Sequence, residues 1–264
     1  MSVSLDEIPE VAKIAWVRLR DQLQVILRND LIALWAHGGT TFPDAPRRPG
    51  DLDTYAVLDR RPDETTVRRI DEVHDLIARD EGVDWDAWYV LAGDAHRSQS
   101  PRHAFRAGRR DTSWAIHRAH WLAGRYVHLL GREPGEVVPG PTWAELEVDL
   151  SRELEHIERH VVEGDTDPFE ATYAIFNGSR ILHAVETGNV VMSKRSAGAW
   201  SLEHLPDRWH PAIHAAGRAY DAPATPDDAE LLATAMAPFV AMVRKRLQML
   251  EQPSAEAVPR WSGY

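Results

Sequence analysis

The hydrophobic pattern of the first third of the chain switches between helical and strand periodicity. Ser4 and Glu7, three residues apart, form a capping box that predicts a helix running to about Arg28. Short apolar runs bounded by turn residues then predict strands, and apolar residues at helical spacing predict one helix among them. These elements are strand 31–37, strand 52–58, helix 64–80 and strand 83–91. The order helix, strand, strand, helix, strand predicts a small α/β unit.

Beyond the polar, arginine-rich segment 93–110, apolar residues keep a helical spacing. In Asp167-Pro168-Phe169-Glu170, a capping aspartate precedes a proline and an acidic first turn, which marks a helix start. The predicted helices are 112–130, 142–162, 167–187, 194–204, 208–220 and 226–250. We therefore predict an α+β chain with an α/β domain over 1–110, a helical bundle over 111–252 and a tail over 253–264.

The composition is that of a globular protein. Of the 264 residues, 44% are hydrophobic and 27% are charged, and cysteine is absent. The absence of cysteine excludes disulfides, thiolate metal sites and a cysteine nucleophile, and it fits a reducing compartment. No apolar run approaches the ~20 residues of a membrane span, and the acidic N-terminus lacks the apolar region of a signal peptide. We expect a cytoplasmic monomer without membrane contacts.

The formal net charge of −11 narrows the choice of partners. Such a field repels nucleic acid and attracts cations. The charge therefore disfavours a nucleic-acid partner and favours a small cationic substrate.

The clearest candidate chemistry lies between Gly38 and Asp53. The buried-looking strand 31–36 leads into Gly38-Gly39, and adjacent glycines let a backbone approach phosphate oxygens closely. Asp51 and Asp53 then open the next strand and, two residues apart, point to the same face. Two carboxylates so close repel each other unless a cation lies between them. The alternative is a turn aspartate followed by an exposed strand aspartate, but the flanking strands and glycines favour a Mg²⁺ site and metal-assisted nucleotide transfer.

A third carboxylate is expected from a neighbouring strand. Asp84 and Asp86 share a face of strand 83–91, and the alternative is that both are surface residues at the strand edge. We favour Asp86 because the apolar part of the strand begins directly after it. Such an acid either completes a second metal site or takes the proton of an attacking hydroxyl.

One predicted helix carries a polar stripe. Glu170, Tyr173, Asn177 and Arg180 fall within about 80° of one another at 100° per residue. A solvated face is one interpretation. The other is a helix facing the cleft between the domains, where Arg180 and Lys194 meet triphosphate oxygens and Glu170 meets a substrate ammonium group.

The histidines show no metal-binding spacing such as HExxH. We expect His117 and His120 at the surface or at a domain interface, and the tryptophans mostly in the core.

Two groups of motifs resemble the aminoglycoside nucleotidyltransferases of the streptomycin/spectinomycin adenylyltransferase type. Gly38-Gly39 followed by Asp51-Leu52-Asp53 is similar to the pattern shared by the nucleotidyltransferase superfamily. The C-terminal half resembles the helical domain of the family more specifically, in order along residues 165–222. The segments concerned are Tyr173–Leu182, Glu186-Thr187-Gly188, Val191–Lys194, Ala199-Trp200, Leu205-Pro206 and Arg218-Ala219-Tyr220.

The resemblance implies a nucleotidyltransferase-type mixed sheet followed by an all-α domain, and an antibiotic-resistance enzyme that uses ATP and Mg²⁺. It implies transfer of AMP to a hydroxyl of an aminoglycoside or aminocyclitol, with release of pyrophosphate. By position, the roles implied are metal binding for Asp51 and Asp53, catalytic base and substrate contact for Asp86, nucleotide binding for Gly38, Gly39, Arg180, Lys194 and Tyr220, and drug binding for Glu170.

The sequence departs from the family at several points. Gly39 and Gly50 stand where serines are often found, the loop between them is rich in proline and arginine, and the third acid is aspartate rather than glutamate. The Trp and Asp that let some relatives accept streptomycin have no clear match ahead of Glu170. Three other interpretations stay open: a nucleotidyltransferase with a metabolite or protein acceptor, a nucleotide-binding module without chemistry, and a structural protein whose Asp-x-Asp is accidental.

Overall fold

The computed structural model describes residues 2–45, 51–162, 164 and 167–251, and the predicted tail 253–264 lies outside them. The chain divides into two compact units, Met1–Glu153 and Leu154–Tyr264. The division falls inside helix α6 (Trp143–Val162).

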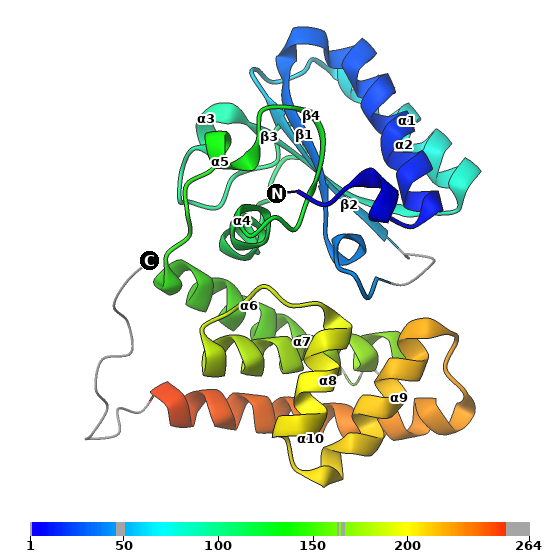
Figure 1. Cartoon of the computed structure of the whole chain (residues 1–264), viewed down its shortest axis with the longest axis vertical. Coiled ribbons are helices and arrows are strands. Elements are labelled where there is room, and N and C mark those ends of the chain that lie inside the picture. Colours follow the sequence, from blue (N-terminus) through cyan, green and yellow to red (C-terminus); the bar gives the residue numbers. More distant parts are fainter. Residues whose placement is uncertain (1, 46–50, 163, 165–166, 252–264) are drawn as a thin grey trace. The chain divides into compact units, whose positions relative to one another are not determined.

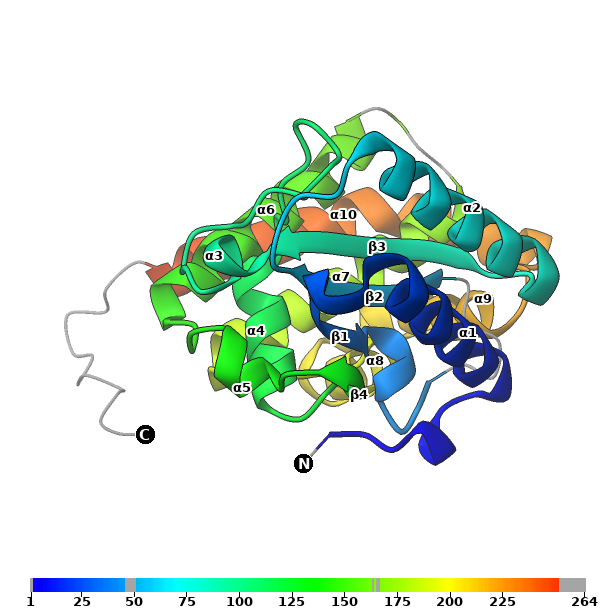
Figure 2. The same ribbon diagram turned by 90° about the horizontal axis from the view of Figure 1, so that it is seen from above.

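The first unit is built on a mixed sheet. The strands are β1 (Leu31–His37), β2 (Asp51–Leu58), β3 (Asp84–Leu91) and β4 (Val127–Gly131), in the order β3-β2-β1-β4. The central strand β1 is antiparallel to both β2 and β4, whereas β2 and β3 are parallel neighbours (Figure 2). The mixed sheet predicted from the resemblance is confirmed.

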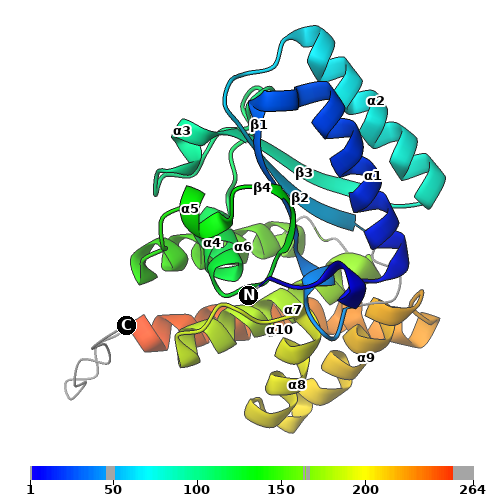
Figure 3. The same cartoon turned by 45° about the horizontal axis from the view of Figure 1, so that its top comes forward.

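Helices cover both faces of this sheet. Helices α1 (Glu10–Leu27) and α2 (Glu64–Glu81) pack against each other on one face (Figures 1 and 3). On the other face lie α3 (Ala92–Ala95), α4 (Trp114–Leu122) and α5 (Pro134–Val137). Alternate residues of β1 supply the two cores: Leu34 packs with α1, whereas Trp35 packs with Trp114 and Trp121 of α4.

Two helix predictions in this unit are wrong. Ser4 and Glu7 do form a capping box, but it caps a short 3-10 turn, and α1 begins only after Pro9. The predicted helix 112–130 ends at Leu122, because Gly124 has a φ of +83° that a helix cannot continue. The chain then forms β4, in which buried and partly exposed residues alternate as the edge of a sheet requires.

The second unit is all-helical, as predicted. Its helices are α7 (Pro168–Thr187), α8 (Lys194–His204), α9 (His210–Asp221) and α10 (Pro226–Glu251), together with the end of α6. Helix α7 contacts α8, α9 and α10 and buries most of its residues (Figure 3). Glycines allow these close contacts: a Cβ on Gly178 would lie 3.1 Å from Phe239 and Val243 of α10.

A pair of glycine substitutions tests this packing. A Cβ on the buried Gly198 of α8 would lie 2.8 Å from Cε1 of Phe176, whereas a Cβ on Gly217 of α9 would meet nothing within 4 Å. We expect Gly198→Ala to lower the free energy of unfolding by about 1 kcal/mol or more through overpacking. We expect Gly217→Ala to raise it by about 0.5–1 kcal/mol because alanine favours a helix. Urea unfolding followed by circular dichroism measures both, and equal shifts for the two variants would contradict the packing argument.

Candidate active site

Three neighbouring strands place three polar residues in one row. Asp53 on β2 pairs with His37 on β1 on one side and with Asp86 on β3 on the other. Because side chains two residues apart share a face, Asp53 and Asp86 lie on the face of Tyr55 and Trp88, which belong to the aromatic core beside α4. The predicted acids of β2 and β3 are therefore neighbours on one face of the sheet.

The same register distinguishes the two candidates for the third carboxylate. Asp84 lies opposite Asp51 at the start of the strand pair, and both residues are exposed. Asp86 lies opposite Asp53 and is half-buried. The register thus supports the choice of Asp86, which stays a prediction.

Gly38 makes room for the Asp53 carboxylate. Its φ is +78°, and a Cβ built on it would lie 1.6 Å from Oδ2 of Asp53. A larger residue would therefore be strained in its backbone and would collide with the acid. Gly39 begins the 3-10 turn Gly39–Thr41 that follows. Gly38 therefore has a structural role, since it lets the turn approach Asp53 closely. The sequence predicted a different role for Gly38, contact with phosphate oxygens, and that contact stays a prediction.

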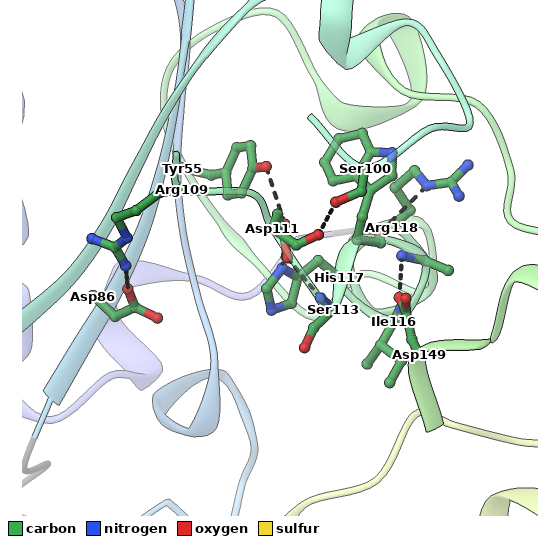
Figure 4. Close-up of polar contacts among 12 residues, drawn as sticks. Tyr55, Asp86, Ser100, Arg109, Asp111, Ser113, Ile116, His117, Arg118 and Asp149 are labelled. Atoms are coloured by element: carbon green, nitrogen blue, oxygen red, sulfur yellow. Dashed lines mark hydrogen bonds and ion pairs between the residues drawn. The ribbon is translucent and has the colours of Figure 1, made fainter. Parts of the chain in front are cut away.

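Asp86 has a cationic neighbour (Figure 4). Nη2 of Arg109 lies 3.6 Å from Oδ1 of Asp86, and both side chains are about half exposed, at 52% and 47%. The guanidinium carbon of Arg109 also lies 4.8 Å from the ring centroid of Trp88, two residues after Asp86 on the same face.

The surroundings of Asp86 favour the protonated form of its carboxyl. Burial raises its pKa above the ordinary value, and the charges of Asp111 and Asp51 add to this effect. The charges of His117 and Arg109 oppose it. A carboxylate with a raised pKa is better suited to accept a proton than an ordinary one, which fits the predicted role of base.

A buried hydrogen-bonded group lies behind this row and was not predicted (Figure 4). The Asp111 carboxylate, which is 1% exposed as a residue, accepts hydrogen bonds from three donors. These are the Tyr55 hydroxyl at 3.1 Å, the His117 imidazole Nδ1 at 2.9 Å and the Ser113 backbone N–H at 2.9 Å. The side chains of Asp111 and His117 therefore form an ion pair inside the first unit.

The pKa values of this pair move in opposite directions. Burial alone would raise the pKa of Asp111, but the charge and hydrogen bond of His117, together with the hydrogen bonds from Ser113 and Tyr55, lower that pKa. Burial alone would lower the pKa of His117, but Asp111, followed by Asp53 and Asp86, raises it above 6.5. Its neighbour His120 is 7% exposed and packs on Phe42, which rules out the surface alternative for His120.

The donor set fits a divalent cation. Mg²⁺ prefers carboxylate oxygens and is usually held by one or two carboxylates together with substrate phosphates and water. Asp51 and Asp53 supply such a pair at the start of β2, and the Asp53 carboxylate lies directly against Gly38. Among the described residues, no group of three or more His, Asp or Glu side chains is placed to hold a metal ion.

The second unit gathers a cation and aromatic rings at the start of α8. Lys194 follows the N-cap Ser193, and its Nζ lies 5.1 Å from the ring centroid of Tyr173 and 5.8 Å from that of Tyr220. Arg195 stacks over Tyr220 at 5.4 Å and forms an ion pair with Asp221. Positive charge at a helix N-terminus favours a bound anion. The structure thus brings the predicted nucleotide residues Lys194 and Tyr220 together.

The polar stripe of α7 is only partly exposed. Asn177 is 3% exposed and accepts a hydrogen bond from Nη1 of Arg180 at 3.1 Å, while Glu170 lies 3.6 Å from Nδ1 of His160. A simple solvated face does not account for a buried asparagine. Phe169, which neighbours Glu170, is 69% exposed.

Residues 148–246 match a protein family described as the C-terminal domain of aminoglycoside adenylyltransferase. The fold is similar to that of a spectinomycin adenyltransferase, AAD(9) from Enterococcus faecialis, whose crystal structure contains ATP and spectinomycin. The TM-score is 0.65 and the identity 14%, over 85% of this chain and 97% of that one. No curated protein matches the chain.

These comparisons confirm the resemblance that the motifs indicated. Residues 148–246 are similar to the C-terminal domain of that family, and the predicted α+β fold is confirmed. Among the helices of the described ranges, none combines the length and apolarity of a membrane span.

Proposed function

We propose that the chain transfers AMP from ATP to a hydroxyl group of a cationic aminoglycoside or aminocyclitol and releases pyrophosphate. The observation that carries this proposal is the row in which Asp53 and Asp86 are paired on neighbouring strands, with Asp51 two residues before Asp53. The fold of a relative crystallised with ATP and spectinomycin supports it, and so does the net charge of −11, which favours a cationic acceptor.

The first unit supplies the reacting groups in this proposal. Asp51 and Asp53 hold Mg²⁺, which neutralises charge on the phosphates when it is bound. The acceptor oxygen attacks the α-phosphorus, the bond from that phosphorus to the pyrophosphate oxygen breaks, and Asp86 accepts the hydroxyl proton. The raised pKa of Asp86 favours this transfer.

The second unit supplies binding groups. Lys194 and Arg180 contact the phosphates, Lys194 as a point charge and Arg180 as a planar fork. Tyr220, whose ring lies beside Lys194, contacts the nucleotide. Gly38 and Gly39 line the phosphates, and Glu170 contacts an ammonium group of the acceptor.

Pyrophosphate release in the presence of ATP and Mg²⁺ tests the proposal across a panel of aminoglycosides and aminocyclitols. We expect release with at least one member of the streptomycin or spectinomycin class, and loss of release when EDTA removes the metal. Binding of ATP without release with any acceptor would indicate a nucleotide-binding module instead. Release only with a metabolite or a protein hydroxyl would overturn the assignment of the acceptor.

A further inference from the structure

We propose that Arg109 is a specificity-determining residue that occupies the place of the acceptor's cationic group on Asp86 and must be displaced before the acceptor binds. This inference rests on the proposed function, since it assigns Asp86 to the acceptor side of the site.

The first argument is the chemistry of the place that Arg109 occupies. Its guanidinium lies 3.6 Å from the Asp86 carboxylate and 4.8 Å from the centroid of the Trp88 ring. A carboxylate beside an aromatic face binds ammonium and guanidinium groups in general, because both partners attract positive charge. Arg109 thus has the same recognition chemistry as an aminoglycoside amine or guanidine.

The second argument is that the backbone of Arg109 is fixed while its side chain is free to swing outward. Its carbonyl accepts a hydrogen bond from the His103 N–H at 3.0 Å, and its N–H donates to the Arg106 carbonyl at 3.3 Å. The preceding Gly108 adopts a φ of +81°, and the adjacent Arg110 forms a β-bridge with Arg102. The Arg109 side chain is 52% exposed, so it can leave Asp86 for water at little cost.

The third argument is that the neighbouring arginines of this loop have other partners. Arg106 pairs with Asp71 of α2 and stacks on Phe105, and Arg110 donates to the Ser100 carbonyl. The contact of Arg109 with Asp86 is therefore a specific feature of that position rather than a general consequence of a basic loop.

Arg109→Gln tests the proposal by removing the internal cation. We expect the KM for a cationic acceptor to fall about fivefold, as is typical when a half-exposed ion pair no longer competes, with the KM for ATP changing less than twofold. Arg109→Lys keeps the charge and should retain most of the wild-type KM. Arg106→Gln removes a charge from the same loop away from Asp86 and serves as the matched control.

A binding measurement without ATP separates this inference from the proposed function. Isothermal titration of the same aminoglycoside into the wild type and Arg109→Gln should show about fivefold tighter binding to the variant. Tighter binding without turnover would overturn the proposed transfer and keep the role of Arg109. An unchanged or weaker affinity, an equal effect of Arg106→Gln, or a rise in the KM for ATP would overturn the role of Arg109.

Discussion

Asp53→Asn is expected to lower turnover by about 10³-fold or more while the fold stays intact. The substitution keeps the size of the side chain and its place against Gly38, but it removes the charge that balances a bound cation. Charge stabilisation and positioning carry most of the catalysis of phosphoryl-type transfer, so the barrier is expected to rise by several kcal/mol. Pyrophosphate release at saturating ATP measures the change.

Asp59→Asn is the matched control for this experiment. Asp59 follows the other end of the same strand and is exposed, and its backbone N–H bonds to the Asp30 carbonyl. Its substitution should leave turnover within twofold of the wild type. If Asp53→Asn kept turnover within tenfold of the wild type, with an unchanged circular dichroism spectrum, Asp53 would not be a metal ligand.

The acidic row Asp51, Asp53 and Asp86 could be predicted because the position of each residue follows from its own strand. Asp51 and Asp53 belong to one strand, and Asp86 stands at the start of the apolar part of the next parallel strand. Strand parity then fixes the face on which each side chain lies. The alternation of side chains along a strand does not determine the register of β2 against β3. That register places Asp86, rather than Asp84, beside Asp53.

The buried polar group around Asp111 was not predicted, because His117 and Arg118 occupy buried positions of a helix. Trp114, His117, Arg118 and Trp121 recur at i, i+3, i+4 and i+7, which is the spacing of a buried stripe. Two tryptophans on that stripe were a signal that α4 turns this face inward. The prediction for His117, at the surface or at a domain interface, did not use this signal.

The partners of these groups come from distant parts of the sequence. Asp111 accepts from Tyr55, 56 residues away, and Arg118 is fully buried and donates to Glu145, 27 residues away. The missed strand β4 has the same cause, since its pairing with β1 spans most of the first unit. Propensity describes neighbours in sequence, whereas these positions are decided by packing.

Asp111→Asn is expected to lower the free energy of unfolding by about 3 kcal/mol near pH 5.5. The variant keeps the shape of the side chain, but the buried His117 loses the charge that offsets its burial. Removing one partner of a buried ion pair typically costs about 3–5 kcal/mol. The asparagine can still accept from the Tyr55 hydroxyl, which favours the lower end of that range.

The pH dependence of this loss identifies the pair as its source. Asp111 has a lowered pKa in the folded state, so its contribution is present above 3.8 and disappears as the pH falls through the folded value. His117 has a raised pKa, so its contribution is present below 6.5 and disappears as the pH rises through the folded value. The difference between wild type and variant should therefore be largest between about pH 4 and 6.5 and shrink on either side.

Urea unfolding followed by tryptophan fluorescence measures this difference, because Trp114 and Trp121 lie in the same core. Asp71→Asn, which removes a partly exposed carboxylate that pairs with Arg106, should change the stability by less than about 1 kcal/mol at any pH. A loss for Asp111→Asn that is the same at pH 5.5 and pH 9 would mean that the hydrogen bonds of Asp111, rather than its charge pair with His117, hold this part of the site. The charge-pair account requires instead that the wild type lose its advantage as His117 becomes neutral, while Asp53 and Asp86 lose a nearby positive charge in the same step.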